Sequence, residues 1–189
     1  MSIKTFTTGE VLTAADTNTY LANAGLVYIT EASAAAGATT LSINNCFSTT
    51  YDNYRVVVSH ADGTVATGLY LRFRNGGTDR TTNYFYAQLG LTTAGGASND
   101  SSGSAALIPI GYLGTSGPYS VTSMDIFQVY TSTLETYGTI QMSFYLAPNY
   151  YARVGNFGRG ADQNDGFTIY PGSGSLDSLK VRVYGYRQS

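Results

Sequence analysis

The chain has 189 residues, of which 43% are hydrophobic and 12% are charged, and its formal net charge is −2. This length suits one domain, with or without a terminal appendage, and the apolar content is sufficient for a core. No concentrated basic patch is present, which argues against nucleic-acid binding, and no window approaches the roughly 18 apolar residues of a membrane span.

The first predicted elements are an extended arm and a short helix. Thr13 can cap this helix, Asp16 suits its first turn, and Gly25 supplies the left-handed residue that ends it. A helix of about three turns is marginal alone in water, so it must dock on another surface. We therefore expect residues 1–25 to form a docking arm and helix ahead of a β-domain at 26–189; docking on its own domain is the alternative. The expected contacts are Phe6, Val11, Leu12, Tyr20 and Leu21.

From Leu26 onward the hydrophobic period is two, as in half-buried strands. The alternation is clearest at 69–74, 139–146 and 179–184. Weaker strands are predicted at Leu26–Thr30, Thr39–Ile43, Tyr54–Ser59, Asn83–Leu89, Ala106–Tyr112, Val121–Tyr130 and Gly166–Tyr170. About ten short strands separated by turn sequences predict an all-β fold, an antiparallel, jelly-roll-like β-sandwich.

Two polar segments interrupt this pattern and are predicted as loops. Thr92–Ser104 contains no large apolar residue, so it is either flexible or ordered by a neighbouring subunit. The second predicted loop, Gly155–Gly166, contains Arg159, Asp162, Asn164 and Asp165.

Catalytic and metal-binding patterns are weak throughout the chain. His60 is the single histidine and no nucleophile-elbow sequence accompanies it. Cys46 is also alone, which excludes an intrachain disulfide and predicts a small buried side chain. The segment 162–166 resembles the start of a calcium loop but lacks the glycine and glutamate at the required positions. Asp125, placed on one face with Val121, is expected to form a structural ion pair rather than act as an acid. We expect no catalytic activity, no cofactor and no metal.

Tyrosine is unusually frequent, with 17 copies and no tryptophan. Tyrosine offers rigid contact area and a hydroxyl group, which suits subunit contacts and sugar faces as well as ordinary strand surfaces. Arginine outnumbers lysine eight to two, and arginine tolerates burial in interfaces better. The candidate residues for subunit or glycan contact are Tyr70, Arg72, Arg74, Tyr84, Tyr86, Tyr150, Tyr151, Arg182, Tyr184 and Tyr186.

The opening sequence GEVLTAAD at 9–16, followed by NTYLAN at 18–23, resembles the N-terminal segment of many structural proteins of tailed bacteriophages. The closing sequence VRVYGYR at 181–187 is similar to the last strand of many phage β-domains. The resemblance implies a non-enzymatic virion protein, made in the host cytoplasm, that binds other virion proteins. A tail-associated or fibre protein is the leading role, and a capsid cement or decoration protein is the alternative. By analogy with phage appendages we expect a homotrimer.

A carbohydrate-binding module is the alternative from a different functional class. Its sugar platform would consist of Tyr150, Tyr151 and the Gly155–Gly166 segment, and its ligand would be a host-surface glycan. A depolymerising enzyme is the least favoured class, because such an enzyme needs two carboxylates across a cleft and the few glutamates lie outside strand interiors.

Overall fold

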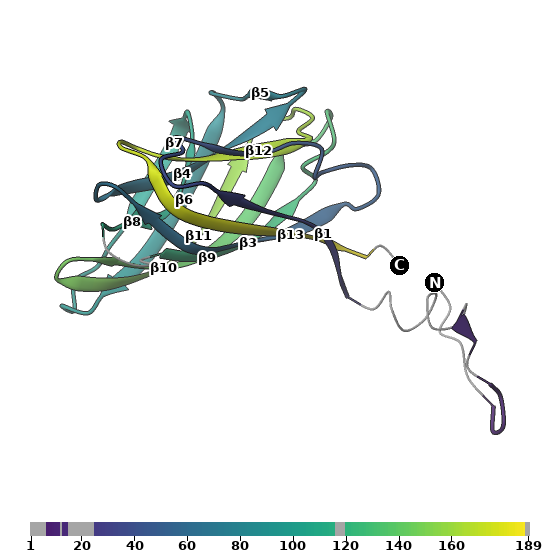
Figure 1. Ribbon diagram of the computed structural model, residues 1–189. Coiled ribbons are helices and arrows are strands. Elements are labelled where there is room, and N and C mark those ends of the chain that lie inside the picture. The colour runs from purple at the N-terminus through teal and green to yellow at the C-terminus, as the bar shows by residue number, and fades with distance from the viewer. Residues whose placement is uncertain (1–6, 12, 15–24, 116–119, 188–189) are drawn as a thin grey trace.

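The computed structural model describes residues 7–11, 13–14, 25–115 and 120–187. The described part is built from antiparallel strands, which confirms the predicted all-β class (Figure 1). The strands are β1 (Leu26–Ala34), β2 (Leu41–Ile43), β3 (Asn53–Gly63), β4 (Thr67–Asn75), β5 (Thr78–Asp79), β6 (Tyr84–Thr92), β7 (Asp100–Ala105), β8 (Ile108–Leu113), β9 (Ser120–Phe127), β10 (Thr136–Leu146), β11 (Asn149–Arg159), β12 (Gly166–Pro171) and β13 (Leu176–Tyr186).

The strand order is that of a jelly roll with two insertions. Strands from the two halves of the chain pair in nested fashion: β1 with β13, β2 with β12, β3 with β9, and β4 with β8. This nesting arises when a long hairpin rolls up into two sheets, which is the double Greek-key arrangement of jelly rolls. The first insertion, β5–β7, and the second, β10–β11, add five strands beyond the nested pairs.

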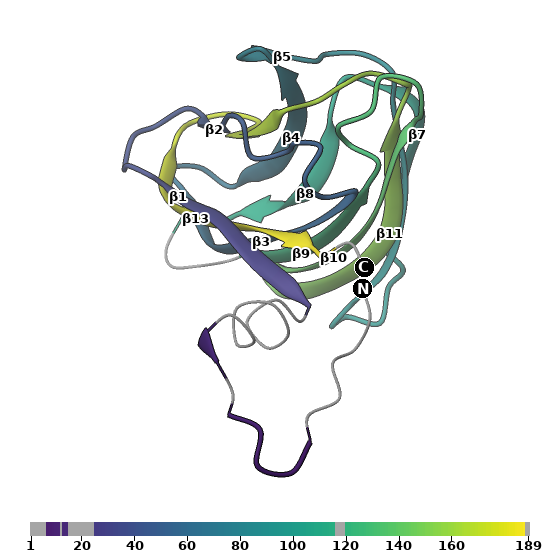
Figure 2. The same cartoon turned by 90° about the vertical axis from the view of Figure 1, so that its right-hand side faces the viewer.

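The insertions make the two sheets unequal. The larger sheet has eight strands in the order β1-β13-β3-β9-β10-β11-β6-β7, and the smaller has the order β2-β12-β4-β5, with β8 also pairing β4. Figure 2 shows the larger sheet curving from β1 below the sandwich and up its side at β11 and β7. One face of the larger sheet therefore covers the core, while its opposite face, called here the outer face, is covered by no described element.

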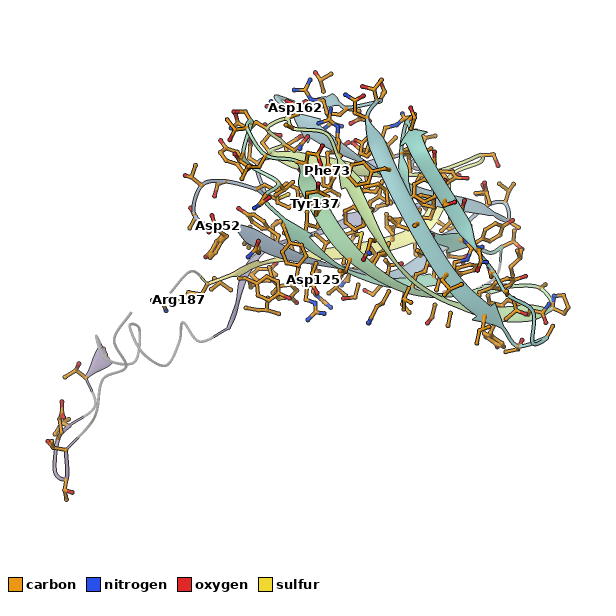
Figure 3. All side chains as sticks on the ribbon, turned by 180° about the vertical axis from the view of Figure 1, so that it is seen from behind. Asp52, Phe73, Asp125, Tyr137, Asp162 and Arg187 are labelled. Atoms are coloured by element: carbon orange, nitrogen blue, oxygen red, sulfur yellow. The ribbon has the colours of Figure 1, made fainter. Side chains whose placement is uncertain are left out.

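Aromatic side chains fill the core between the sheets. Phe73 of β4 is fully buried, with ring centroids 6.2 Å from Tyr84 and 6.5 Å from Phe157 (Figure 3). Phe47 lies 5.7 Å from Phe167 and 4.7 Å from Tyr54, with the rings in stacked and edge arrangements respectively. The alternation at 69–74, 139–146 and 179–184 is confirmed, because the apolar members of each segment face this core.

Both predicted loops are partly strands. Residues 155–159 continue β11, which pairs with β10 on one side and β6 on the other. In the other segment, β7 pairs with β6 of the same chain, so intrachain backbone hydrogen bonds order it. The prediction failed because neither segment supplies a run of large apolar side chains: pairing on both sides holds the glycine-rich 155–159, and β7 is a polar edge strand.

The predicted helix is not among the described elements, because most of it falls at 15–24, outside the described residues. Gly25, expected to end it, has a left-handed φ of 92°. The arm and helix therefore stay predictions, whereas β1 begins at Leu26 as expected.

A buried arginine holds the end of β11. The side chain of Arg159 is 5% exposed, and its Nη1 lies 3.0 Å from Asp162 Oδ2 and 3.4 Å from Asn164 Oδ1. Arg80 also pairs with Asp162, at 3.1 Å. The adjoining Asp165 accepts a hydrogen bond from the backbone N–H of Gly76 at 2.8 Å. These carboxylates thus hold the protein's own arginines and backbone, which fits a structural turn rather than a calcium loop.

Cys46 is buried, as predicted, at 4% exposure. Burial removes the hydration of the thiolate and raises the pKa of this thiol well above its usual range. We expect the native protein to consume no Ellman's reagent at pH 8 over an hour, and one equivalent in denaturant. Rapid reaction of one equivalent with the folded protein would contradict this burial.

Candidate binding face of the eight-stranded sheet

The outer face of the eight-stranded sheet gathers most of the exposed apolar surface. Of the eleven large apolar side chains that are exposed among the described residues, eight lie on this face. Soluble monomers rarely expose contiguous apolar surface of this kind, and such surfaces mark contact sites. The eight are Leu26, Tyr28, Leu89, Leu91, Val121, Tyr137, Tyr150 and Val154.

The register of the strands places five of these apolar residues together at one end of the face. Leu91, Ala152, Ser143 and Val121 follow one another across β6, β11, β10 and β9, and Leu89 pairs with Val154 one step along. Leu91 is 67% exposed and Leu89 62% exposed. We call the set Leu89, Leu91, Val121, Tyr150, Ala152 and Val154 the apolar patch. Two open depressions, lined in part by these side chains, lie over it.

A polar groove adjoins the apolar patch and shares Leu89 and Val154 with it. It is an open depression of about 600 Å³ that crosses β7, β6, β11, β10, β9 and β3. Its floor is a row of cross-strand neighbours, and its remaining polar lining comes from Gln88, Asn99, Asp100, Ser123 and Gln141. The row consists of Ser101, Ala87, Asn156, Thr139, Asp125 and Arg55.

Most polar side chains of the groove have no internal partner. Asn156, Thr139 and Gln141 form no side-chain hydrogen bond with any described residue, and the same holds for Asn99, Ser101 and Ser123. These six side chains are uncharged and offer donors and acceptors to a ligand.

The charged residues of the groove are paired. Arg55 Nε lies 3.3 Å from Asp125 Oδ1, and Tyr186 donates its hydroxyl proton to the same carboxylate at 2.6 Å. Burial and the adjacent Asp125 carboxylate raise the pKa of Tyr186. The predicted ion pair of Asp125 is thus present. Asp125 shares a face with Val121 as expected, and this face is the outer one, because the odd-numbered positions of β9 face outward (Figure 3).

Aromatic rings border the groove on two sides. Phe85 and Tyr137 meet edge to face at 5.8 Å above Gly158, where an added Cβ would lie 2.3 Å from the Phe85 ring. At the β13–β1 end, Tyr184 and Tyr28 meet at 5.9 Å, and Tyr28 is 57% exposed. Rings placed beside free amide and hydroxyl groups suit a ligand with both apolar and polar faces.

The predicted contact residues on β4 lie on the outer face of the smaller sheet and serve the fold. Arg74 donates to Asp79 at 2.8 Å and to Ser42 at 2.7 Å. Arg72 lies 4.7 Å over the Tyr170 ring and donates to the Ala106 carbonyl. Tyr70 packs 5.8 Å from Tyr170. Both guanidinium groups are therefore engaged within the chain.

The remaining predicted contact residues divide between the core and the outer face of the larger sheet. Tyr84 is fully buried and Tyr151 stacks on Phe144 at 5.0 Å, so neither forms the expected surface platform. Tyr86 also points inward and is half-buried. The residues that do lie on the outer face are Tyr150, Arg182, Tyr184 and Tyr186.

Glu31 links β1 to the rest of the larger sheet. It lies 2.7 Å from Arg182 and 3.1 Å from Lys180, and hydrogen bonds from these two side chains lower the pKa of its carboxyl. Because the Glu31 side chain is accessible to solvent, water and salt screen these pairs. They orient the side chains of the outer face more than they stabilise it.

Of the predicted docking residues, Val11 alone lies among the described residues, and its side chain is 78% exposed. Thr7 and Glu10 next to it form a turn closed by a 3.0 Å backbone hydrogen bond. Figure 1 shows this described stretch lying apart from the sandwich. Phe6, Leu12, Tyr20 and Leu21 fall outside the described residues.

No group of three or more potential metal ligands occurs in the described ranges. Within the same ranges, no helix has the length and apolarity needed to cross a bilayer. His60 lies within β3, which continues to Gly63.

Comparison with known proteins gives a likeness of fold alone. No family model and no curated protein matches the chain. One solved structure that it is similar to is a non-specific endo-β-1,3(4)-glucanase of family GH16, with 11% identity and a TM-score of 0.21. The match covers 78% of this chain and 63% of the glucanase chain. At that TM-score the likeness carries no argument about activity.

Proposed function

We propose that the chain is a non-enzymatic structural component of a bacteriophage particle. It docks through its N-terminal arm, assembles as a trimer through the outer face of the larger sheet, and serves as a tail-associated or fibre protein. The observation that carries the proposal is the apolar patch, an exposed sheet face whose side chains neither the sandwich nor any other described element covers.

Two further observations support this proposal. The jelly roll closes between β1 and β13, and residues 7–11 belong to no strand of either sheet. The opening and closing sequences resemble those of phage structural proteins, as described above. The alternative role, capsid cement or decoration, uses the same arm and face and differs in the particle surface that the arm grips.

Leu91→Glu tests the assembly surface. A glutamate at this position would be desolvated in the trimer without a partner, so we expect the trimer dissociation constant to rise by about two orders of magnitude. Leu134→Glu is the matched control, because Leu134 is also an exposed leucine but lies outside the apolar patch. Sedimentation velocity over a concentration series measures both variants. The apolar patch is not the trimer interface if the two variants dissociate equally, or if the wild-type protein is monomeric at all concentrations.

Carbohydrate binding by the sandwich is the second candidate, and the polar groove favours it. The platform expected at Tyr150, Tyr151 and Gly155–Gly166 is not assembled, since Tyr151 faces the core and residues 155–159 lie within β11. The groove offers a different set of side chains for the same class of ligand.

A further inference from the structure

We propose that the polar groove on the outer face is a binding site for a neutral, linear oligosaccharide lying across the strands. This site is separate from the arm and needs no particle to function. This proposal rests on the carbohydrate-binding candidate above for its class of ligand. It adds which residues bind the oligosaccharide, that the oligosaccharide is uncharged, and that it lies across the strands.

The position of the groove on the face of a sheet decides which ligand groups it can bind. The backbone N–H and C=O groups of β11, β10 and β9 are already paired within the sheet, so the ligand meets side chains alone. A peptide that binds by strand addition needs a free sheet edge instead. The free groups here are the amides of Asn156 and Gln141 and hydroxyls such as that of Thr139, which match a ligand rich in hydroxyl groups.

The charge of the groove selects a neutral ligand. Its charged lining consists of Arg55, Asp100 and Asp125, which sum to a formal charge of −1. Arg55 is also committed to Asp125. Nucleic acids and acidic polysaccharides would meet no free cation and would be repelled by the net charge.

The shape of the groove selects a chain rather than a single sugar. The floor row crosses six strands, and five steps of about 4.8 Å between neighbouring strands give a length of roughly 24 Å. The apolar side chains of Leu89 and Val154 lie beside the amide side chains in the groove, and the exposed ring of Tyr137 lies at its border. A pyranose ring presents an apolar face and a polar rim, so alternating apolar and amide side chains match successive rings.

The test is a titration of the isolated full-length protein with neutral hexasaccharides: β-1,4-linked glucose, β-1,3-linked glucose, α-1,4-linked glucose and β-1,4-linked mannose. Hyaluronan hexasaccharide serves as the acidic probe. Two-dimensional ¹⁵N NMR follows the side-chain amide signals of Asn156 and Gln141, which should shift with at least one neutral probe and not with hyaluronan. Repeating the titration with Leu91→Glu shows whether self-association covers the groove.

Asn156→Ala and Gln141→Ala should each weaken binding by about fivefold to tenfold, the value of one or two lost hydrogen bonds. Asn44→Ala is the matched control, because Asn44 is an exposed asparagine outside the groove. The groove is not an oligosaccharide site if neither the wild type nor Leu91→Glu binds a neutral probe, or if hyaluronan binds more tightly than the neutral probes. Equal affinity in all three alanine variants would also contradict the proposal. Particle incorporation is measured separately, so failure here leaves the structural role intact.

Discussion

A chain that begins at Gly25 is expected to fold with the melting temperature of the full-length protein and to be absent from assembled particles. The sandwich closes through the pairing of β1 with β13, and the nearest described backbone contact to the arm is the hydrogen bond from Arg187 N–H to the Gly25 carbonyl. Removing residues 1–24 therefore takes no described strand from either sheet. The truncation should therefore abolish incorporation into particles and leave the stability of the fold unchanged.

Incorporation is measured by complementing a phage that lacks the protein, followed by mass spectrometry of the purified particles. Full-length protein supplied in the same way is the control. If the truncated chain unfolds or aggregates, the helix belongs to the core of its own domain and the docking assignment is wrong. If the truncated chain joins particles normally, the arm is not the attachment device.

Asp162→Ala is expected to lower the free energy of unfolding by about 3 kcal/mol, because it leaves the buried Arg159 guanidinium without its carboxylate. Arg159 would keep the 3.4 Å contact with Asn164 and its position 5.6 Å over the Tyr84 ring, and Arg80 would lose the same carboxylate. Urea unfolding at pH 7 measures the change.

Asp177→Ala is the control for this prediction, since Asp177 is exposed and an exposed aspartate should contribute less than about 0.5 kcal/mol. A loss for Asp162→Ala no larger than that of the control would show that Arg159 is adequately held by its remaining neighbours.

The hydrophobic pattern predicted the strands whose two faces differ most. Along β10, Ile140, Met142 and Phe144 face the core while Thr139 and Gln141 face outward, and the period of two is visible in the sequence. The number and spacing of such strands predicted an antiparallel, jelly-roll-like sandwich but not which strands pair.

The strand β11 was missed because its pattern has no large apolar side chain at several inward positions. Gly155 faces the core side, where a Cβ would meet the Ala87 carbonyl at 2.3 Å, and Arg153 and Arg159 occupy other inward positions. Partners supplied by β10 and β6 compensate for these residues, and partners far apart in the sequence leave no local signal.

The polar groove could not be predicted for the same reason. The sequence pattern places Thr139 and Gln141 on the polar side of a strand, but it places Asn156 in a predicted loop, whereas the structure has it in β11. The groove exists because β11 aligns Asn156 with Thr139 and β9 aligns Asp125 with the same residue. Its signal in the sequence is the excess of amide and hydroxyl residues at alternate positions. This excess indicates a groove only when the pairing register of β9, β10 and β11 is known.

Quantitative mass spectrometry of purified virions, combined with cryo-electron microscopy of the same particles, tests the central proposal most directly. We expect the chain at a fixed stoichiometry in multiples of three, with density for the jelly roll at a tail or shell position and its N-terminal end toward the particle. Absence of the protein from purified virions, while it accumulates free in the lysate, would contradict a structural role.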